Sequence, residues 1–218
     1  MYINLHTHRK PQISNELCIR NAYTASTSRL THLSYYTCVG VHPWLGNDER
    51  HNSYENIREA LDLPNVIAIG ECGLDRNRGP ALSTQMLHLE QQLELAEKLA
   101  KPVIFHIVRA YTDLVPLTKK YSFTGIVHGF NGNIYEAQTL VKHGIRISLG
   151  HRMLWERRFS PILKWIPTDF LYLETDNFPI SIKTCYEYAM LVRGEELFQL
   201  QRNIVRNFER DFSLVLPT

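Results

Sequence analysis

The sequence lacks the segments that mark membrane and secreted proteins. No apolar run reaches the roughly 18 residues that a membrane-spanning helix needs, and no basic stretch followed by an apolar one opens the chain. We therefore expect neither a membrane protein nor a secreted one, and a cytoplasmic location is the default expectation.

Net charge is also small. The chain has 24 basic and 22 acidic side chains, a formal net charge of +2, which is too little for a general nucleic-acid-binding surface. Any contact with a polyanion must come from a local patch. The densest patches are Arg76 with Arg78 and a second group made of His151, Arg152, Arg157, Arg158 and Lys164. For each patch, the simpler interpretation is a solvated loop or helix face.

Cysteine pairs are absent. The four cysteines are far apart in the chain and form no Cys-x-x-Cys motif: Cys18, Cys38, Cys72 and Cys185. This spacing excludes a zinc knuckle or a redox pair of that type. In a cytosolic chain we expect all four to be reduced and structural.

No Gly/Ser-rich linker, low-complexity tract or internal repeat divides the 218 residues, so we expect a single domain over residues 1–218. Apolar runs such as Val66-Ile67-Ala68-Ile69 favour strands that are covered on both faces, as in a parallel sheet. The predicted strands are Tyr2–His8, Leu17–Thr24, Tyr36–His42, Val66–Leu74, Pro102–Val108, Gly125–Gly129, Ile145–Gly150 and Phe170–Thr175.

Helical segments alternate with these strands. The three-to-four spacing of apolar residues predicts a helix over Leu82–Ala100, for which Ser83 is a plausible N-cap. A second helix, Glu136–His143, stops before Gly144. The remaining helical candidates are Tyr54–Leu61, Arg202–Phe212, and Cys185–Val192 with Glu195–Gln201, the last two forming either a helix pair or one broken helix.

Eight strands that alternate with helices predict an α/β fold, a compact (β/α)₈ TIM-like barrel. Its first quarter is short of residues. Only Arg9–Glu16 separates the first two predicted strands, whereas a βαβ crossover takes at least about 10–12 residues. The next crossover, Ala25–Tyr35, is also short. We expect the first one or two helical crossovers to be reduced.

Barrel enzymes carry their catalytic groups at the carboxyl ends of the strands. His6 and His8 lie two residues apart on one strand, so both imidazoles point to the same face. Later strand ends add further groups of metal-binding type: His42, Glu71, His106, His128 and Asp176. Any one of these histidines alone would more often be a core or surface residue, and Asp176 alone could cap a helix. Their conjunction at separate strand ends predicts a metal site.

Imidazoles and carboxylates suit two divalent ions, with zinc, manganese, magnesium and nickel all compatible. Two ions roughly 3.5–4 Å apart need a bridging group. Glu71 is the candidate bridge, because its strand lies between the one that carries His6 and His8 and those that carry His106 and His128.

The order and context of these residues resemble a known family, the TatD-related metal-dependent deoxyribonucleases, among the amidohydrolase-like barrel hydrolases. The resemblance spans nearly the whole chain except Arg9–Tyr35, and it continues into the tail Asn203–Phe208. The matching segments are Leu5–His8, Gly40–Pro43, Ile69–Asp75, Pro102–His106, His128–Gly132, Ile147–Gly150 and Leu173–Asp176.

The resemblance implies a role for each matching position. One metal would be held by His6, His8 and Asp176, the second by His106 and His128, and both by Glu71. His42 would line the substrate site. The implied activity is that of a DNase of exonuclease type acting on strand ends.

In the mechanism that we expect, a metal-activated water attacks a phosphodiester, and Asp176 takes the proton from that water. His42, Arg76 and Arg109 are candidates for contacts with the phosphates, and Glu71 shares the catalytic role through the metals. DNA, single-stranded or bound at its end, is the expected partner.

Three positions depart from the family pattern. Asn4 stands where an aspartate is usual, and Arg9-Lys10 stands where an aspartate usually follows the histidine pair. Arg109 comes one place later than the usual arginine after His106.

Two alternatives remain open. The same scaffold could hydrolyse a lactone, amide or ester, since fold does not determine substrate. The barrel could instead serve as a subunit of a larger repair or defence complex, with the altered Arg9–Tyr35 surface as its protein interface.

Overall fold

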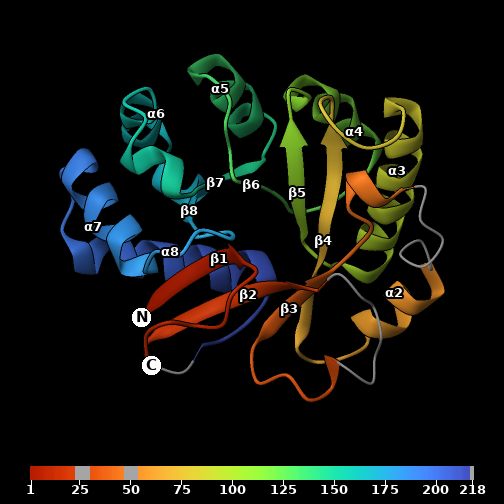
Figure 1. The fold of residues 1–218 in the computed structure, drawn as a ribbon, viewed down its shortest axis with the longest axis horizontal. Coiled ribbons are helices and arrows are strands. Elements are labelled where there is room, and N and C mark those ends of the chain that lie inside the picture. Colours follow the sequence, from red (N-terminus) through yellow and green to blue (C-terminus); the bar gives the residue numbers. More distant parts are fainter. Residues whose placement is uncertain (23–29, 47–53, 217–218) are drawn as a thin grey trace.

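The computed structural model describes residues 1–22, 30–46 and 54–216. Eight strands form one parallel sheet in chain order (Figure 1). They are β1 (Tyr2–Thr7), β2 (Glu16–Ala22), β3 (Tyr36–Val39), β4 (Val66–Asp75), β5 (Val103–Val108), β6 (Gly125–His128), β7 (Arg146–Leu149) and β8 (Leu171–Leu173).

The sheet closes between its first and last strands. The amide of Asp176, just beyond β8, donates to the His6 carbonyl at 3.0 Å, and the amide of His8 donates to the Asp176 carbonyl at 3.2 Å. The hydroxyl of Thr7 adds a bond to the same Asp176 carbonyl at 2.9 Å. These contacts form the seam of the barrel, and the predicted (β/α)₈ architecture is confirmed.

Helices surround the sheet (Figure 1). They are α2 (Tyr54–Leu61), α3 (Leu82–Leu99), α4 (Leu114–Lys120), α5 (Ile134–Lys142), α6 (Phe159–Trp165), α7 (Ile182–Arg193) and α8 (Leu197–Phe212). Four short 3₁₀ helices are η1 (Pro43–Leu45), η2 (Tyr111–Asp113), η3 (His151–Leu154) and η4 (Thr168–Phe170). Over the described ranges, no helix is both long enough and apolar enough to cross a membrane. The cytoplasmic location stays a prediction.

The helix boundaries differ in places from the predicted ones. Ser83 is not an N-cap, because the helix begins after Ala81, whose carbonyl accepts from the amides of Thr84 and Gln85. The helix α5 begins two residues early, because Asn133 and Glu136 form a reciprocal capping box.

Two further differences concern the number of helices: two predicted helices are one, and two short helices were missed. The candidates Glu195–Gln201 and Arg202–Phe212 form one helix, α8, and α7 is the partner helix before it. The short helices α4 and α6 were not predicted.

The first quarter of the barrel is reduced, as expected. No helix lies in the described stretch between β1 and β2. Part of the predicted Leu17–Thr24 strand and part of the Ala25–Tyr35 crossover fall in residues 23–29, outside the described residues. The side chain of Arg20 lies 4.5 Å from the ring centre of Tyr35 and bonds its hydroxyl. Most positions of β2 are nevertheless half-buried, whereas β4 is buried throughout.

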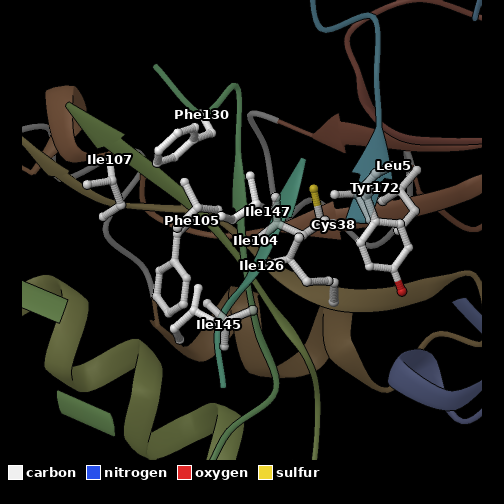
Figure 2. Packing of buried hydrophobic residues seen from close by; sticks show 14 of the residues in the cluster. Leu5, Cys38, Ile104, Phe105, Ile107, Ile126, Phe130, Ile145, Ile147 and Tyr172 are labelled. Carbon is white, nitrogen blue, oxygen red and sulfur yellow. The ribbon is translucent and has the colours of Figure 1, made fainter. Parts of the chain in front are cut away.

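The core is built from side chains of neighbouring strands. Figure 2 shows Ile104 of β5, Ile126 of β6 and Ile147 of β7 packed among other apolar residues, and all three are fully buried. On the outer side, α3 packs against β4 and buries Leu89 and Leu93. The apolar packing fixes the strands, so that their carboxyl ends hold a polar cluster in a defined arrangement.

Candidate metal centre

The structure brings all six predicted ligands to the carboxyl end of the barrel. His6 lies in β1 and His8 directly after it, Glu71 in β4, His106 in β5, His128 at the end of β6 and Asp176 after β8. Glu71 lies at the centre of this group, which we call the Glu71 cluster. Its side chain contacts the four histidines, and Asp176 reaches the group through His8.

The two oxygens of Glu71 face different histidines. Oε1 lies 2.8 Å from Nε2 of His128 and 3.0 Å from Nδ1 of His106. It also lies 3.4 Å from Nε2 of His42. Oε2 lies 3.4 Å from Nε2 of His6 and 3.7 Å from Nε2 of His8. A carboxylate that divides its oxygens in this way has the arrangement of a bridging group.

Asn21 of β2 fixes the orientation of Glu71. Its Nδ2 donates to Glu71 Oε2 at 2.9 Å, and its Oδ1 accepts from the Glu71 amide at 3.3 Å. Asn21 thus bonds both the backbone and the side chain of Glu71, and this fixes where the carboxylate points. No sequence pattern pointed to Asn21, which is a lone amide in a half-exposed strand.

Two glycines flank Glu71 and let β4 approach β5. Gly70 and Gly73 have φ of +146° and +148°, a region that L side chains rarely adopt. A Cβ on Gly70 would lie 2.5 Å from the Ile104 carbonyl oxygen, and one on Gly73 would lie 2.1 Å from that of His106. Side chains at these positions would therefore push β4 away from β5, and with it Glu71 away from His106.

Asp176 is positioned by the barrel seam. Its φ is +50°, and its backbone makes the two bonds that join β8 to β1. Its Oδ1 lies 3.2 Å from Nε2 of His8 and 3.9 Å from that of His6. Burial alone would raise the pKa of Asp176, but the hydrogen bond from His8 and the charges of His128 and His6 lower it below its usual value. The carboxylate is therefore ionised at neutral pH.

Burial and charge oppose one another at the centre of the cluster. Burial acts to raise the pKa of Glu71, but the charges of His128 and His6 and hydrogen bonds with His106 and His128 bring it well below the usual value. Burial acts to lower the pKa of His128, but the carboxylates of Glu71 and Glu174 raise it well above the usual value. The pKa shifts of Glu71 and His128 thus both favour the charged form, although both side chains are buried.

Two acidic residues stand behind the histidines on the Oε1 side. Asp75 Oδ2 lies 3.3 Å from Nε2 of His106 and accepts from the Trp44 indole at 2.7 Å. Burial acts to raise the pKa of Asp75, but the hydrogen bonds with His106 and Trp44 lower it to about 2. Glu174 Oε1 lies 3.3 Å from Nδ1 of His128 and accepts from the Gly129 amide at 2.9 Å.

These carboxylates act on the second ring nitrogen of each histidine, the usual arrangement behind a metal-binding imidazole. Sequence reasoning assigned them no role. A signal was nonetheless present, because Asp75 ends the β4 motif and Glu174 stands two residues before Asp176.

Asn4, the first departure from the family pattern, is explained by its neighbours. Its Nδ2 donates to Glu16 Oε1 at 2.7 Å and to Thr175 Oγ1 at 2.9 Å, and its Oδ1 accepts from the Thr175 amide at 3.0 Å. Asn4 thus links the Glu16 carboxylate of β2 to Thr175, the residue before Asp176.

The residues present fit a metal centre. Both ring nitrogens of His6 are buried and have no hydrogen-bond partner in the described part of the chain. Such buried polar atoms are costly unless a ligand satisfies them. Two groups have ligand atoms close enough to share an ion, one of His6, His8 and Glu71, the other of His42, Glu71 and His106. Imidazole with carboxylate is a donor set for zinc, manganese and related ions.

A cleft of about 460 Å³ opens beside the Glu71 cluster, with His106, His128 and Asp176 in its wall. Arg109, a predicted substrate contact, also lines it, as do His151 and Arg152. Arg76 does not line this cleft: its Nη2 forms an exposed ion pair with Asp113 Oδ2 at 2.8 Å. His42 does not line the cleft either: its ring lies against Glu71, beside the Glu71 cluster.

Comparison with known proteins gives a consistent result. The family model described as TatD related DNase matches residues 13–213. The chain is 34% identical over 150 residues to a protein named uncharacterized metal-dependent hydrolase YjjV of Escherichia coli strain K12, covering 65% of this chain and 57% of that protein. It is 33% identical over 207 residues to a protein named 3'-5' ssDNA/RNA exonuclease TatD of Citrobacter rodentium, covering 84% of this chain and 79% of that one.

Solved structures show the same fold. The crystal structure of YjjV, a TatD homologue from Escherichia coli K12, aligns with a TM-score of 0.85 at 25% identity and covers 98% of both chains. A TatD-family hydrolase from Entamoeba histolytica aligns with a TM-score of 0.79 at 18% identity and covers 97% of both chains. In sequence, the match spans little more than half the length of the Escherichia coli relative.

Proposed function

Because the chain belongs to the TatD related DNase family, we propose that it is a divalent-metal-dependent hydrolase that cleaves phosphodiester bonds at the ends of DNA. The observation that carries the proposal is the division of the Glu71 oxygens between two groups of imidazoles. A bridging carboxylate of this kind suits a two-metal centre, and two-metal centres are common among nucleases.

In this proposal two ions, of zinc, manganese or magnesium, are held at the Glu71 cluster. His6, His8 and Asp176 would hold one ion, His106 and His128 would hold the other, and Glu71 would serve both. Divalent ions bound there would supply the Lewis acidity that activates water at neutral pH and offsets charge on the phosphoryl oxygens.

The protein's own groups supply positioning and proton transfer. Asp176 is ionised and lines the cleft, so it can accept the proton of the attacking water. Asp75 and Glu174 hold the rings of His106 and His128 in the required orientation. Arg109, His42 and Arg76 remain the candidates for contacts with the scissile or flanking phosphates.

The proposed substrate is single-stranded or frayed DNA. Support comes from relatives whose names describe an exonuclease for single-stranded DNA and RNA. A cleft of about 460 Å³ lies within the range of about 300–1,000 Å³ for small-ligand sites, which suits one or two nucleotides rather than a duplex. RNA is the second substrate to test, and a protein partner at the reduced first quarter stays a prediction.

The decisive experiment measures nucleotide release from end-labelled single-stranded DNA, single-stranded RNA and duplex DNA, with zinc, manganese, magnesium or nickel added to metal-free protein. Glu71→Gln should abolish release and lower the bound metal, because it removes the charge shared by both groups of imidazoles. Glu94→Gln, at an exposed position on α3, is the matched control and should behave as the wild type.

Two results would contradict the proposal. Full activity of Glu71→Gln would remove the bridging role. Absence of nucleotide release by the wild type with every metal, together with hydrolysis of a lactone, amide or ester, would assign the site to the alternative substrate class.

A further inference from the structure

Three aromatic rings form a cluster at one rim of the cleft. His151 of η3 and Phe178, which follows β8, are stacked with ring centres 4.3 Å apart and planes 10° apart. The indole of Trp155 lies 5.0 Å from the Phe178 ring and 5.8 Å from the His151 ring. His151 also lines the cleft that contains Asp176. The cluster therefore adjoins the site where a phosphodiester would react.

Trp155 is the open member of this cluster, with 58% of its surface exposed. A single exposed aromatic residue is ordinary on a protein surface. Here, however, the exposed ring contacts two others, and one of them, His151, lines the cleft. An exposed indole in contact with other rings offers a π-face to a planar ligand at little cost in side-chain entropy.

Trp44, which lies near His42 and His106, has different contacts from Trp155. It is 42% exposed, but its indole N–H donates to Asp75 at 2.7 Å and the guanidinium of Arg78 lies 4.5 Å from its ring centre. Trp44 thus holds a buried carboxylate, and a cation covers one face. Within the described part of the chain, no cation lies over the ring of Trp155.

A positive charge stands next to the cluster. Arg152 follows His151 in η3, lines the cleft and is about half exposed, and its guanidinium forms an exposed ion pair with Glu156 at 3.3 Å. An exposed pair of this kind is weak, so the guanidinium remains available to a phosphate. Aromatic faces combined with a basic groove are the recurring means of binding single-stranded nucleic acid.

We infer that His151, Trp155 and Phe178 form a base-stacking subsite, which receives an unpaired nucleobase while the adjacent phosphodiester lies at the Glu71 cluster. This inference rests on the proposed nuclease function and specifies how that function selects its substrate. Bases inside a duplex are already stacked on their neighbours, so the subsite favours single strands and frayed ends.

Binding of a phosphorothioate-linked oligothymidylate, which resists hydrolysis, tests the subsite directly. Affinity is measured by fluorescence anisotropy with manganese present, for the wild type, Trp155→Ala, Trp155→Phe and Trp165→Ala. The last variant is the matched control, because Trp165 is 37% exposed on α6 and does not line the cleft. A second oligonucleotide, which carries abasic sugars in place of nucleotides, isolates the contribution of the bases.

Trp155→Ala should weaken binding of the oligothymidylate about tenfold, the typical loss for one stacked base, and Trp155→Phe should recover much of it. Trp165→Ala should bind like the wild type. The abasic oligonucleotide should bind the wild type and Trp155→Ala equally, because it has no base to stack. A merely structural role for Trp155 would weaken both oligonucleotides by the same factor.

Equal affinities of wild type and Trp155→Ala for the oligothymidylate would overturn the subsite, as would an equal loss for both oligonucleotides or no measurable binding by the wild type. Nucleotide release from unmodified DNA is assayed on the same preparations. Failure of release alone overturns the proposed function, whereas failure of the binding pattern alone overturns the subsite.

Discussion

The two oxygens of Glu71 face two groups of side chains that are held in different ways. On the Oε1 side, His106 and His128 each have a carboxylate behind the ring, at 3.3 Å in both cases. On the Oε2 side, neither ring nitrogen of His6 has a hydrogen-bond partner among the described residues. A carboxylate thus stands behind each ring on the Oε1 side, whereas no described residue holds the ring nitrogens of His6 in this way.

The Oε2 half depends instead on closure of the barrel. The backbone of Asp176 bonds to His6 and His8, and Thr7 adds a side-chain bond to the same carbonyl. The seam that completes the sheet is thus also the element that places Asp176 beside His8. Loss of the Asp75 or Glu174 carboxylate should therefore impair the Oε1 half, and loss of Asp176 or of the seam should impair the Oε2 half.

Among variants that affect only one half of the cluster, the largest effect is expected from Asp176→Asn, which keeps the backbone seam but removes the proton acceptor of the Oε2 half. Turnover should fall about 100- to 10,000-fold, the usual contribution of a general base. Metal should be retained at the Oε1 half. The measurement is the turnover number together with the metal content of each variant by plasma mass spectrometry.

Asp169→Asn is the control for this variant, because Asp169 lies in η4, at the opposite end of β8, and is exposed. A near-normal rate of Asp176→Asn with both metals bound would show that another group takes the proton. Loss of all metal would instead show that the two halves of the cluster do not bind independently.

The strand-end residues could be predicted from the sequence because the repeating pattern of the barrel decides where they go. Once eight strands are placed, all their carboxyl ends meet at one face, and imidazoles or carboxylates found there must be neighbours. His6, Glu71, His106 and His128 needed no further information. The reduced crossover between β1 and β2 was likewise a matter of counting residues.

The supporting contacts could not be predicted in this way. Asn21, Asp75 and Glu174 reach the cluster through side-chain conformations and through the register between strands, which shifts within the β4–β5 pair. Asn4 illustrates the difficulty, since its effect depends on Glu16 of the next strand. A sequence pattern indicates the type of side chain at a strand end, but not which neighbour it bonds.

A smaller effect is expected from Glu174→Gln, which weakens the brace behind His128 while retaining its shape. Metal affinity should fall about 10- to 100-fold, as is usual for carboxylates behind a metal-binding histidine. The measurement is a competition titration with a metal-binding dye. Glu187→Gln is the control, because Glu187 is 47% exposed and forms only a surface pair with Lys183. Unchanged affinity would mean that the Oε1 half needs no brace and would remove the contrast between the halves.

The smallest effect on turnover is expected from Asn4→Asp, which restores the residue usual in the family. The substitution removes the donor that bonds Glu16 and Thr175, and it sets two carboxylates at hydrogen-bond distance from each other. The free energy of unfolding should fall by about 1–3 kcal/mol, the usual cost of a lost buried partner. Turnover should change only a few-fold, because the backbone seam still holds Asp176.

The double variant Asn4→Asp with Glu16→Gln decides whether Asn4 stabilises the protein alone or as a pair with Glu16. It exchanges donor and acceptor, so that the amide introduced in β2 can donate to the carboxylate introduced in β1, and one carboxylate remains at the site. Most of the lost stability should return, as measured by urea unfolding in a double-mutant cycle. Additive losses in the double variant would show that Asn4 acts alone. Recovery would show that residues 4 and 16 act as a pair across β1 and β2, because one donor and one carboxylate then suffice at the site whichever strand carries each of them.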